Sequence, residues 1–561
     1  MPSSTFQTHE VTNQPPPFAD VNLYLADAAF AEAVAREGSG ALGDERDRLA
    51  HLGAEAGSAR ALEIGRLANA HPPRLSRFDA QGRPLNLVEF HPAYHDAMRM
   101  SFAAGLHCSA WDHLSTGEAP RPGAHVSRLA GIYMMTQMEA GHVCPITMTN
   151  AAVATLLQAP DLARPLLGKI LSRTYDPSFA PIPSKAGITI GMGMTEKQGG
   201  TDVRANTTVA TPQPGGSSGH RYMLVGHKWF MSAPMSDAFL MLAQAPRGLS
   251  CFLVPRFRED GTANALEFQR LKDKLGNRSN ASSEVELRGA EGFLVGEEGR
   301  GIATIIEMVT LTRLDCAVAS AGQMRLALSL ALHHARHRRV FGRRLVEQPL
   351  MARVLADMSL DVEAATALSF RLARAFDRAA GDEREAAWRR LMTPVTKYWV
   401  CKMAPALGYE AMECLGGNGY VEEGLAARLY RELPLNAIWE GSGNVMCLDV
   451  LRVVRAGPEA LDSVLAEIAE QSCGDPGIAA LIASVRWQMQ DCDMLETGAR
   501  MLVETLALAA AAALLRANAP VPVADAFIAT RLAGGFRHTY GAGRGDIAVG
   551  PLLQRASPEA G

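Results

Sequence analysis

The sequence lacks the cysteine patterns of a metal site or a disulfide framework. Its nine cysteines are scattered singly, without a Cys-x-x-Cys pair or a Cys/His cluster at zinc spacing. This distribution argues against zinc-binding modules and disulfide-stapled secreted domains. It indicates reduced, mostly buried thiols, so we expect a cytoplasmic protein without a bound metal.

The chain also lacks a strong charge of either sign and a membrane-spanning segment. A net charge of −4 over 561 residues does not by itself indicate a nucleic-acid ligand. The first eighteen residues are polar and proline-rich, unlike a signal peptide. The most apolar run, Met501 to Leu515, contains Glu504 and is too short to cross a bilayer. We interpret it as a buried, alanine-rich helix and expect no membrane association.

The sequence does contain long helical periodicity on both sides of a β-rich middle. Apolar residues at three- and four-residue spacing predict helices over 44–69, 91–107 and 128–139. Short β-rich runs separated by Gly, Pro and Asp predict a compact antiparallel domain, with strands near 188–190, 222–225, 238–242, 250–254 and 283–287. Three long helices with short connections, 301–337, 349–380 and 382–415, predict an antiparallel bundle.

These patterns predict an α+β multidomain protein in four parts. They are an N-terminal arm and helical domain (1–185), a β domain (186–296), a helical bundle (297–456) and an extra C-terminal helical region (457–561).

One candidate for chemistry is the stretch Ile438-Trp439-Glu440-Gly441-Ser442-Gly443-Asn444. Two glycines favour a tight turn, and the tryptophan offers a flat apolar wall beside the carboxylate. Partly apolar surroundings raise the pKa of a carboxyl toward the range useful to a general base. Taken alone, the pattern also fits a solvated loop.

A second candidate is the glycine-rich segment from Gly191 to Val203, which follows a predicted strand. Its exposed amides and Thr side chains suit the polar edge of a cofactor. The third glycine of the dinucleotide-binding fingerprint is absent, and no βαβ unit surrounds the segment, which argues against a Rossmann site. A turn that binds nothing is the alternative.

Five segments in one order resemble the acyl-CoA dehydrogenases. They are Met194-Thr-Glu196 with Gly199-Gly-Thr-Asp202, Gly226-His-Lys-Trp-Phe-Met-Ser232, Arg338-Arg-Val-Phe341-Gly342, Leu415-Gly-Gly-Asn-Gly-Tyr420 and Trp439-Glu-Gly-Ser442. The resemblance implies the fold of that family, with an N-terminal helical domain, a central antiparallel β domain and a C-terminal four-helix bundle. Here it is followed by an extra helical region.

Further segments narrow the resemblance to the AidB branch. They are Asn13-Gln-Pro15, Asn22-Leu-Tyr-Leu25, Pro145-Ile-Thr-Met148 and Met192-Gly-Met-Thr-Glu-Lys-Gln-Gly-Gly200. This resemblance implies an FAD protein that is similar to isovaleryl-CoA dehydrogenases, with a role in the response to DNA alkylation and binding to double-stranded DNA. The alternative is an ordinary metabolic acyl-CoA dehydrogenase without a DNA role.

The resemblance implies a role for each matching residue in dehydrogenation of a short or branched acyl-CoA. Glu440 matches the base that removes the α-proton. Isovaleryl-CoA dehydrogenases carry their base at the position of Thr312, which cannot act as a base at neutral pH, so Glu440 is the remaining candidate. The neighbouring Arg313 is expected to approach a CoA phosphate, with an interhelix arginine as the alternative.

For FAD, the resemblance implies residues from four segments of the chain. They are Met192, Gly193, Met194, Thr195, Gly200 and Thr201; Trp229, Phe230, Met231 and Ser232; Arg338 and Phe341; and Ile438, Trp439, Gly441, Ser442, Gly443 and Asn444. Arg338 and Phe341 match positions that reach FAD across a subunit interface. The chain is therefore expected to form at least a dimer, and tetramers are usual in the family.

The C-terminal region is the candidate for DNA binding. From residue 458 onward seven arginines and no lysine stand against twelve acidic residues, so the region as a whole is not basic. Its last part, with Arg531, Arg537 and Arg544 among glycines, is basic and could form a phosphate-binding patch in an oligomer. An exposed tail that binds nothing is the alternative.

Overall fold

A computed structural model describes residues 8–38, 43–214, 221–490, 495–532, 540 and 547–556. The N-terminal part is helical, with one two-stranded hairpin, β1–β2. Its elements are α1 (Ala28–Glu37), α2 (Gly43–Ala56), α3 (Ala59–Ala70), β1 (Arg74–Phe78), β2 (Pro84–Glu89), α4 (Pro92–Ala103), α5 (His113–Thr116), α6 (Ala124–Met138), α7 (Val143–Leu156) and α8 (Pro160–Ile170).

The helix predicted over 44–69 is two helices, α2 and α3. Gly57 and Ser58 separate them, and the Ser58 side chain accepts a hydrogen bond from Ala61 N as the N-cap of α3. A Cβ atom on Gly57 would lie 1.8 Å from the Val21 carbonyl oxygen. The close approach of the N-terminal arm therefore requires glycine at this break, which apolar spacing alone does not reveal.

The middle of the chain forms a seven-stranded sheet. Its strands are β3 (Ile190–Gly193), β4 (Val209–Pro212), β5 (Arg221–Ser232), β6 (Ala238–Ala245), β7 (Gly248–Pro255), β8 (Leu266–Leu271) and β9 (Ser282–Val295). Most pairs are antiparallel, as predicted, but β3 pairs with β6 in parallel, with Ile190 opposite Ala238. The sequence prediction missed β4 and β8, whose alternating burial leaves few apolar residues in a row.

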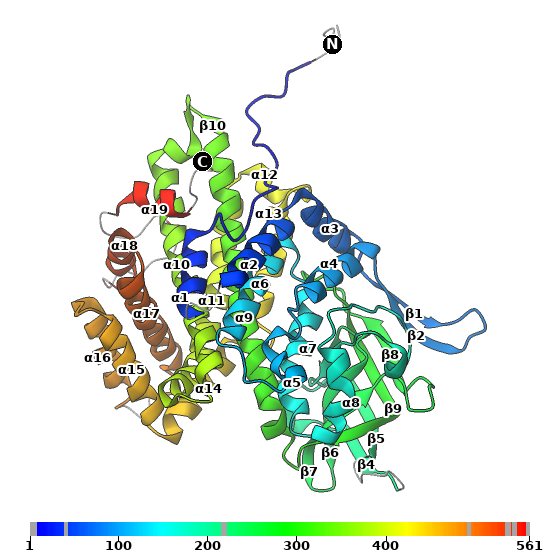
Figure 1. Ribbon diagram of the computed structural model, residues 1–561. Helices are drawn as coiled ribbons and strands as arrows, with labels where there is room; N and C mark the ends of the chain where they lie inside the picture. The colour runs from blue at the N-terminus through cyan, green and yellow to red at the C-terminus, as the bar shows by residue number, and fades with distance from the viewer. Residues whose placement is uncertain are drawn as a thin grey trace.

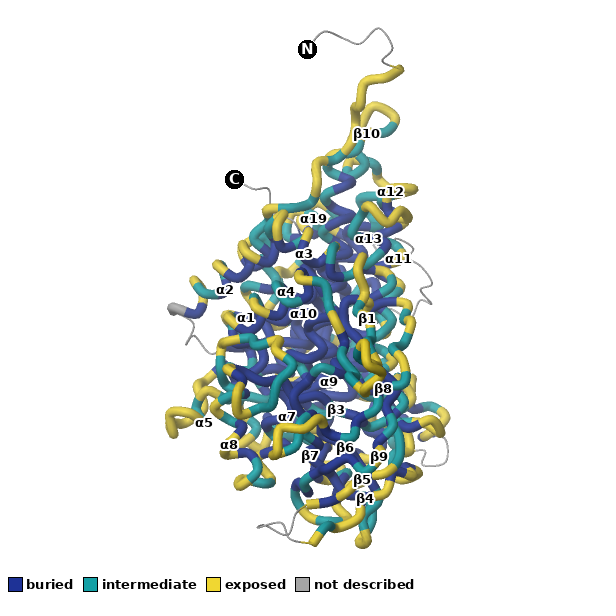
Figure 2. The backbone as a smooth tube through the Cα atoms, turned by 90° about the vertical axis from the view of Figure 1, so that its right-hand side faces the viewer, coloured by how far each residue is buried: buried dark blue, intermediate teal, exposed yellow. Residues whose placement is uncertain are grey.

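The long helices follow the prediction closely. They are α9 (Gly301–His337), α10 (Pro349–Arg378) and α11 (Glu383–Cys414), and they pack against one another. Shorter elements complete this part: β10 (Arg339–Val340), β11 (Arg343–Arg344), α12 (Gly417–Tyr420), α13 (Leu425–Glu432) and α14 (Gly443–Ala456). The centres of α9 and α10 are buried, whereas the β10–β11 hairpin and the N-terminal arm stand out from the body (Figure 2).

The C-terminal region consists of α15 (Glu459–Gln471), α16 (Pro476–Gln488), α17 (Ala499–Asn518), α18 (Val521–Arg531) and α19 (Val549–Ala556). These helices lie along the bundle on the side away from the β domain (Figure 1), and their apolar residues belong to the same core as α9, α10 and α11. Helix α17 is long and apolar enough to cross a membrane, but 67% of its most apolar window is buried inside the protein.

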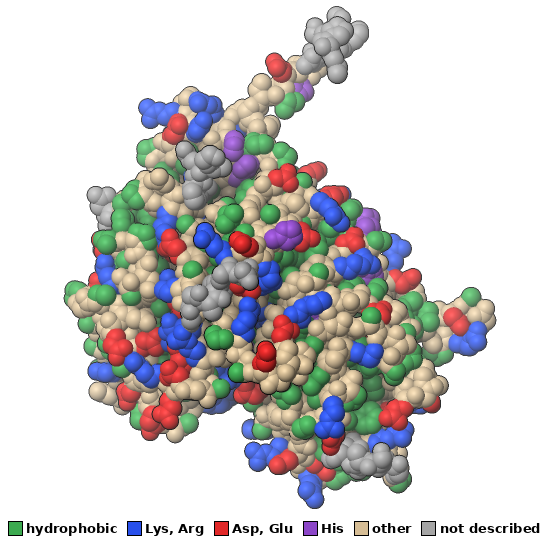
Figure 3. Space-filling model, viewed as in Figure 1, with side chains coloured by type: hydrophobic (Ala, Val, Ile, Leu, Met, Phe, Trp, Pro, Cys, Tyr) green, Lys and Arg blue, Asp and Glu red, His purple; other side chains and the backbone are tan. Residues whose placement is uncertain are grey.

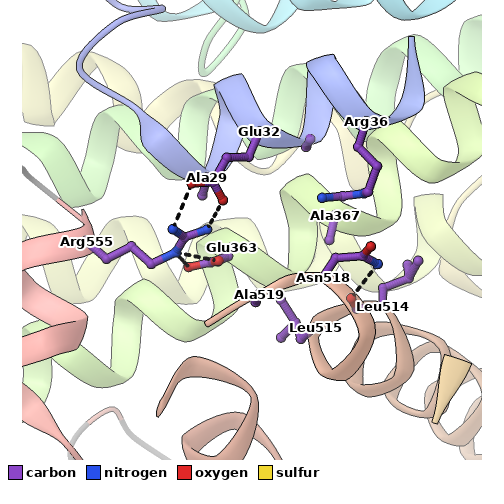
Figure 4. A pocket seen from close by; sticks show the side chains of 11 residues that line it. Ala29, Glu32, Arg36, Glu363, Ala367, Leu514, Leu515, Asn518, Ala519 and Arg555 are labelled. Carbon is purple, nitrogen blue, oxygen red and sulfur yellow. Dashed lines mark hydrogen bonds and ion pairs between the residues drawn. The ribbon is translucent and has the colours of Figure 1, made fainter. Parts of the chain in front are cut away.

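Ion pairs fix the C-terminal region to distant parts of the chain. Arg555 on α19 pairs with Glu32 on α1 at 2.6 Å and with Glu363 on α10 at 2.8 Å (Figure 4). Arg371 on α10 is buried and bridges Glu385 on α11 and Glu467 on α15. Helix α19 thus packs against α1, the first helix of the chain.

Candidate active site

The turn that carries Glu440 has an unusual backbone. It follows the 3-10 helix Leu435–Ala437 and precedes α14. Glu440 has a φ of +58° and Gly441 a φ of +101°, both in the left-handed region. A Cβ atom on Gly441 would lie 2.6 Å from Met446 Cε. A strained glutamate beside an obligatory glycine is typical of a functional turn held by its surroundings.

Two cationic side chains hold three consecutive carbonyl groups of this turn. Lys397 Nζ on α11 donates hydrogen bonds to the carbonyl oxygens of Trp439 and Gly441. Arg313 Nε on α9 donates to the Glu440 carbonyl oxygen at 3.0 Å. The peptide groups around the carboxylate are therefore fixed from two bundle helices, α9 and α11.

The carboxyl group of Glu440 faces α9. Thr312 Oγ1 donates a hydrogen bond to Glu440 Oε2 at 2.7 Å. Burial raises the pKa of Glu440 above its usual value, while the Thr312 hydroxyl, the Lys397 ammonium and the Arg313 guanidinium oppose that rise. A raised carboxyl pKa suits a general base that works near neutral pH.

The glycine-rich segment is organised around a fully buried glutamate. Glu196 accepts hydrogen bonds from the hydroxyl and amide groups of Thr207 and Thr208 and from Lys228 Nζ. Burial alone would raise the pKa of Glu196, but Lys228 and these donors hold it well below its ordinary value. This ionised carboxylate fixes the turn of Met194 and Thr195, whose carbonyl accepts from Trp229 N at 2.8 Å.

The end of β5 presents an apolar face with a hydroxyl beside it. Phe230 is 49% exposed, and Ser232 Oγ lies 3.1 Å from Ser282 Oγ. The Met231 side chain, in contrast, is fully buried within the sheet, so only its backbone is available to a ligand. One face of Trp229 is covered by Lys272, whose Nζ lies 3.2 Å from the ring centre.

The two turns meet around one buried cluster. Met192, Met194 and Trp439 all pack against the apolar residues contributed by α7, β3, β6 and the start of α9. The Cys144 thiol on α7 lies in the same cluster, and its burial raises its pKa. The structure therefore places the turn of the predicted base and the glycine-rich turn against one apolar cluster.

Three family models match successive parts of the chain. "Adaptive response protein AidB N-terminal domain" matches residues 13–177, "Acyl-CoA dehydrogenase, middle domain" matches 191–290, and "Acyl-CoA dehydrogenase, C-terminal domain" matches 299–455. The AidB protein of Escherichia coli (strain K12) is 54% identical over 454 residues, which is 80% of this chain and 81% of that protein. The chain belongs to the AidB branch of the acyl-CoA dehydrogenase family.

Solved structures agree with this assignment to the acyl-CoA dehydrogenase family. ACDH-11 of Caenorhabditis elegans in complex with C11-CoA is 26% identical, with a TM-score of 0.83, covering 98% of this chain and 93% of that one. The apo form of Bd2924 is 27% identical, with a TM-score of 0.82, covering 90% of this chain and 99% of that one. The predicted acyl-CoA dehydrogenase fold is thus confirmed.

Members of the acyl-CoA dehydrogenase family bind FAD, and the residues of this site fit an isoalloxazine ring. That ring is flat and apolar, with a polar edge. The half-exposed ring of Phe230 and the side chains of Met194 and Trp439 suit its apolar surface. The Ser232 hydroxyl and the Thr195 side chain suit its edge, and Met192, Gly193, Gly200 and Thr201 continue the same turn.

The two residues predicted to reach FAD from a neighbouring subunit lie far from their own Glu440. Arg338 follows the end of α9, about 39 Å along the helix from Thr312. Phe341 sits at the tip of the β10–β11 hairpin, 98% exposed, with a φ of +50°. Arg338 Nη1 donates to the Asn13 carbonyl at 2.7 Å. A contact to FAD from these residues would have to be made with another copy of the chain.

For Arg313, the structure favours the alternative, an interhelix arginine, over a contact with a CoA phosphate. Its side chain is buried, because Nε holds the Glu440 carbonyl and Nη1 pairs with Asp449 at 2.8 Å. Asn444 is also engaged, since its Oδ1 accepts from Arg500 Nε on α17 at 2.9 Å. Ser442 is the N-cap residue of α14. Ile438, at the start of the turn that carries Glu440, is 65% exposed.

One residue of the predicted DNA-binding patch, Arg531, is not available to bind DNA. Arg531 is buried and pairs with Asp357 and Asp361 on α10, so it does not offer its charge to a phosphate. Arg537 and Arg544 lie outside the described residues. On the face seen in Figure 3, basic and acidic side chains are interspersed.

Two residues beside Glu440 escaped the sequence prediction. Thr312 appeared only as a position that cannot act as a base, whereas its hydroxyl binds the Glu440 carboxylate. Lys397 was not singled out, although a lysine within the apolar run Val395-Thr-Lys-Tyr-Trp399 is a signal for a buried cation with a specific partner. Among the described residues, no group of three His, Cys, Asp or Glu side chains could hold a metal ion.

Proposed function

We propose that this protein binds FAD and dehydrogenates a short or branched acyl-CoA between Cα and Cβ, with Glu440 as the base. FAD, when bound, supplies the acceptor for the hydride that leaves Cβ. Glu440 takes one proton from Cα, and the electron pair of that C–H bond forms the Cα–Cβ double bond as the hydride leaves Cβ. In the described part of the chain Glu440 Oε1 accepts no hydrogen bond, so this oxygen is open to the proton.

The observation that carries this proposal is the environment of the Glu440 carboxyl. Its pKa is raised by burial, it is oriented by Thr312, and its turn packs on the same cluster as Met194 of the glycine-rich segment. The complex of the similar ACDH-11 with C11-CoA supports an acyl thioester as substrate. By family resemblance we also propose a cytoplasmic homotetramer.

Anaerobic mixing tests this function. The FAD-loaded full-length protein is mixed with straight-chain and branched acyl-CoAs of increasing length, and the flavin absorbance is followed. We expect at least one acyl-CoA to bleach the oxidised flavin band. A panel that binds without bleaching the flavin would contradict dehydrogenation.

We also propose a role in the response to DNA alkylation, supported by the match of residues 13–177 to the adaptive-response model. The metabolic alternative, without a DNA role, predicts no duplex binding. A salt series on the full chain separates the two readings. Phosphate contacts make duplex affinity fall steeply with salt. An Arg537→Ala/Arg544→Ala double variant should have a shallower salt dependence, by about two units of slope if both arginines bind phosphates.

A further inference from the structure

Lys397 is a buried ammonium group without a close carboxylate. Its side chain is 1% exposed in the middle of α11. Among the described residues, no Asp or Glu oxygen lies within 4.0 Å of its Nζ, and its hydrogen bonds go to the carbonyls of Trp439 and Gly441. Burying a charge without an ionic partner is costly. The free-energy cost of burying this charge must therefore be offset by the interactions that Lys397 makes with its surroundings.

The contacts of Lys397 lie on the two peptide groups that flank the catalytic residue. Glu440 has a left-handed backbone, which is unfavourable for a non-glycine residue and persists only where neighbours hold it. Lys397 is attached to the residue before Glu440 and to the residue after it. Its ammonium group also interacts with the Glu440 carboxylate through space.

We propose that Lys397 is a positioning residue for the base: its ammonium group fixes the two carbonyls beside Glu440, and its charge favours the ionised carboxylate. The inference rests on the proposed role of Glu440 as the base. The Arg313 guanidinium also lowers the pKa of Glu440, but its charge is paired with Asp449. Lys397, in contrast, has no carboxylate close to its ammonium group among the described residues, so its positive charge acts on Glu440 without being neutralised.

The other titratable and charged groups facing this pair come from every helix packed against it. They are Arg313, Asp315 and Cys316 on α9, Cys401 on α11, Asp449 on α14 and Cys144 on α7. The three thiols are buried, and their pKa values are raised, so they stay uncharged at neutral pH. Asp315 pairs with Arg128. Neither the thiols nor Asp315 therefore supplies the positive charge that Lys397 supplies.

Two substitutions separate the two parts of the proposal. Lys397→Met removes both the charge and the hydrogen-bond donor with little change in volume, whereas Lys397→Gln keeps an N–H donor and removes the charge. Loss of the charge raises the pKa of Glu440, and the base works only when ionised. The pH midpoint for flavin reduction by acyl-CoA should therefore move to higher pH in both variants.

The maximal rate should distinguish the variants. Loss of the carbonyl contacts misplaces the carboxylate, and a displacement of about 1 Å costs roughly 10²-fold in rate. Lys397→Met should lose about that much even at high pH, and Lys397→Gln should lose less. Lys169→Met is a matched control, because Lys169 also donates to two backbone carbonyls, those of Pro183 and Lys185, but on α8. It should leave both midpoint and rate unchanged.

A second readout does not depend on turnover. The infrared carboxyl band of Glu440 in the FAD-loaded protein, assigned by difference from Glu440→Gln, is titrated in the wild type and both Lys397 variants. An upward shift of its titration in the variants supports the inference, even if no acyl-CoA reduces the flavin and the proposed function fails. An unchanged titration in folded, FAD-containing variants overturns the inference, even if the wild type is an active dehydrogenase. If Lys397→Met does not fold, Lys397→Gln decides alone.

Discussion

The Thr312 hydroxyl can serve the Glu440 carboxyl in both of its protonation states. It lies within hydrogen-bond distance of Glu440 Oε2, at 2.7 Å, and of the Val309 carbonyl, at 2.9 Å. A hydroxyl has one proton and two lone pairs. It can donate to an ionised Glu440, or accept from a protonated one while it donates to Val309. Glu440 can therefore remain hydrogen-bonded to the Thr312 hydroxyl after it has taken up a proton.

This arrangement predicts different results for two conservative substitutions of Thr312. Thr312→Val removes the donor to the ionised carboxylate at nearly constant volume, so the pKa of Glu440 should rise. Flavin reduction by acyl-CoA should then require higher pH than in the wild type. Thr312→Ser keeps the hydroxyl and should retain the wild-type pH profile. Identical profiles for Thr312→Val and Thr312→Ser would show that the hydrogen bond does not act on the base.

At the scale of residues, motifs predicted positions better than contacts. The family resemblance made Glu440, Phe230 and the turn around Thr195 candidates, because their motifs occur in the order of the family, and their roles stay predictions. It left Arg313 open between a CoA phosphate and an interhelix contact, since nothing in the sequence shows that Asp449, 136 residues later, lies within 2.8 Å of that guanidinium. Pairing across helices depends on packing, which local patterns do not encode.

At the scale of elements, long helices were predictable and short strands were not. The prediction of 301–337 coincides with α9, because thirty-seven residues of sustained periodicity give a strong signal. Strands β4 and β8 have only four and six residues and alternate in burial. The β10–β11 hairpin is shorter still. It depends on the N-terminal arm, a contact more than three hundred residues distant in sequence.

Asn13 should control the opening of the β10–β11 hairpin. Its side chain accepts from Arg339 N at 2.7 Å and donates to the Arg339 carbonyl at 2.8 Å, and its φ is +57°. Asn13→Ala removes both hydrogen bonds, each contributing about 1 kcal/mol, and places alanine in a conformation that it disfavours. Hydrogen exchange of residues 339–344 should accelerate at least about tenfold, with little change in the global melting temperature.

Gln14→Ala is the neighbouring control for this measurement of hydrogen exchange. Among the described residues, the Gln14 side chain makes one hydrogen bond, a long one of 3.5 Å from Asn418 Nδ2 to Gln14 Oε1. Its substitution should leave exchange in the hairpin as in the wild type. Equal protection in both variants would mean that the arm does not hold the hairpin that presents Phe341.

At the scale of the whole molecule, the C-terminal region is part of the body of the protein. Its helices share one apolar core with the bundle, and Arg500 on α17 reaches Asn444 at the start of α14. The extra helices were predictable from the sequence, whereas Arg531 was expected to be a surface charge. Burial of an arginine between two aspartates of another helix is not visible in a local count of charges.

Substitution of Arg531 should therefore lower the free energy of unfolding. Arg531→Met leaves Asp357 and Asp361 without this buried cation, a change that typically costs 3–5 kcal/mol. Denaturant unfolding should show that loss, whereas Arg486→Met, an exposed arginine on α16, should be nearly neutral. Equal stability of Arg531→Met and the wild type would return Arg531 to the candidate DNA surface.

The central claim concerns Glu440, and one comparison of two proteins tests it most directly. FAD-loaded wild type and Glu440→Gln are mixed anaerobically with the acyl-CoA that best bleaches the wild-type flavin, and the reduction rates are measured. The account predicts equal FAD content and a rate lower by roughly 10²–10⁴-fold in the variant, because the amide cannot remove the α-proton. Equal reduction rates in the two proteins would contradict the assignment of Glu440 as the base.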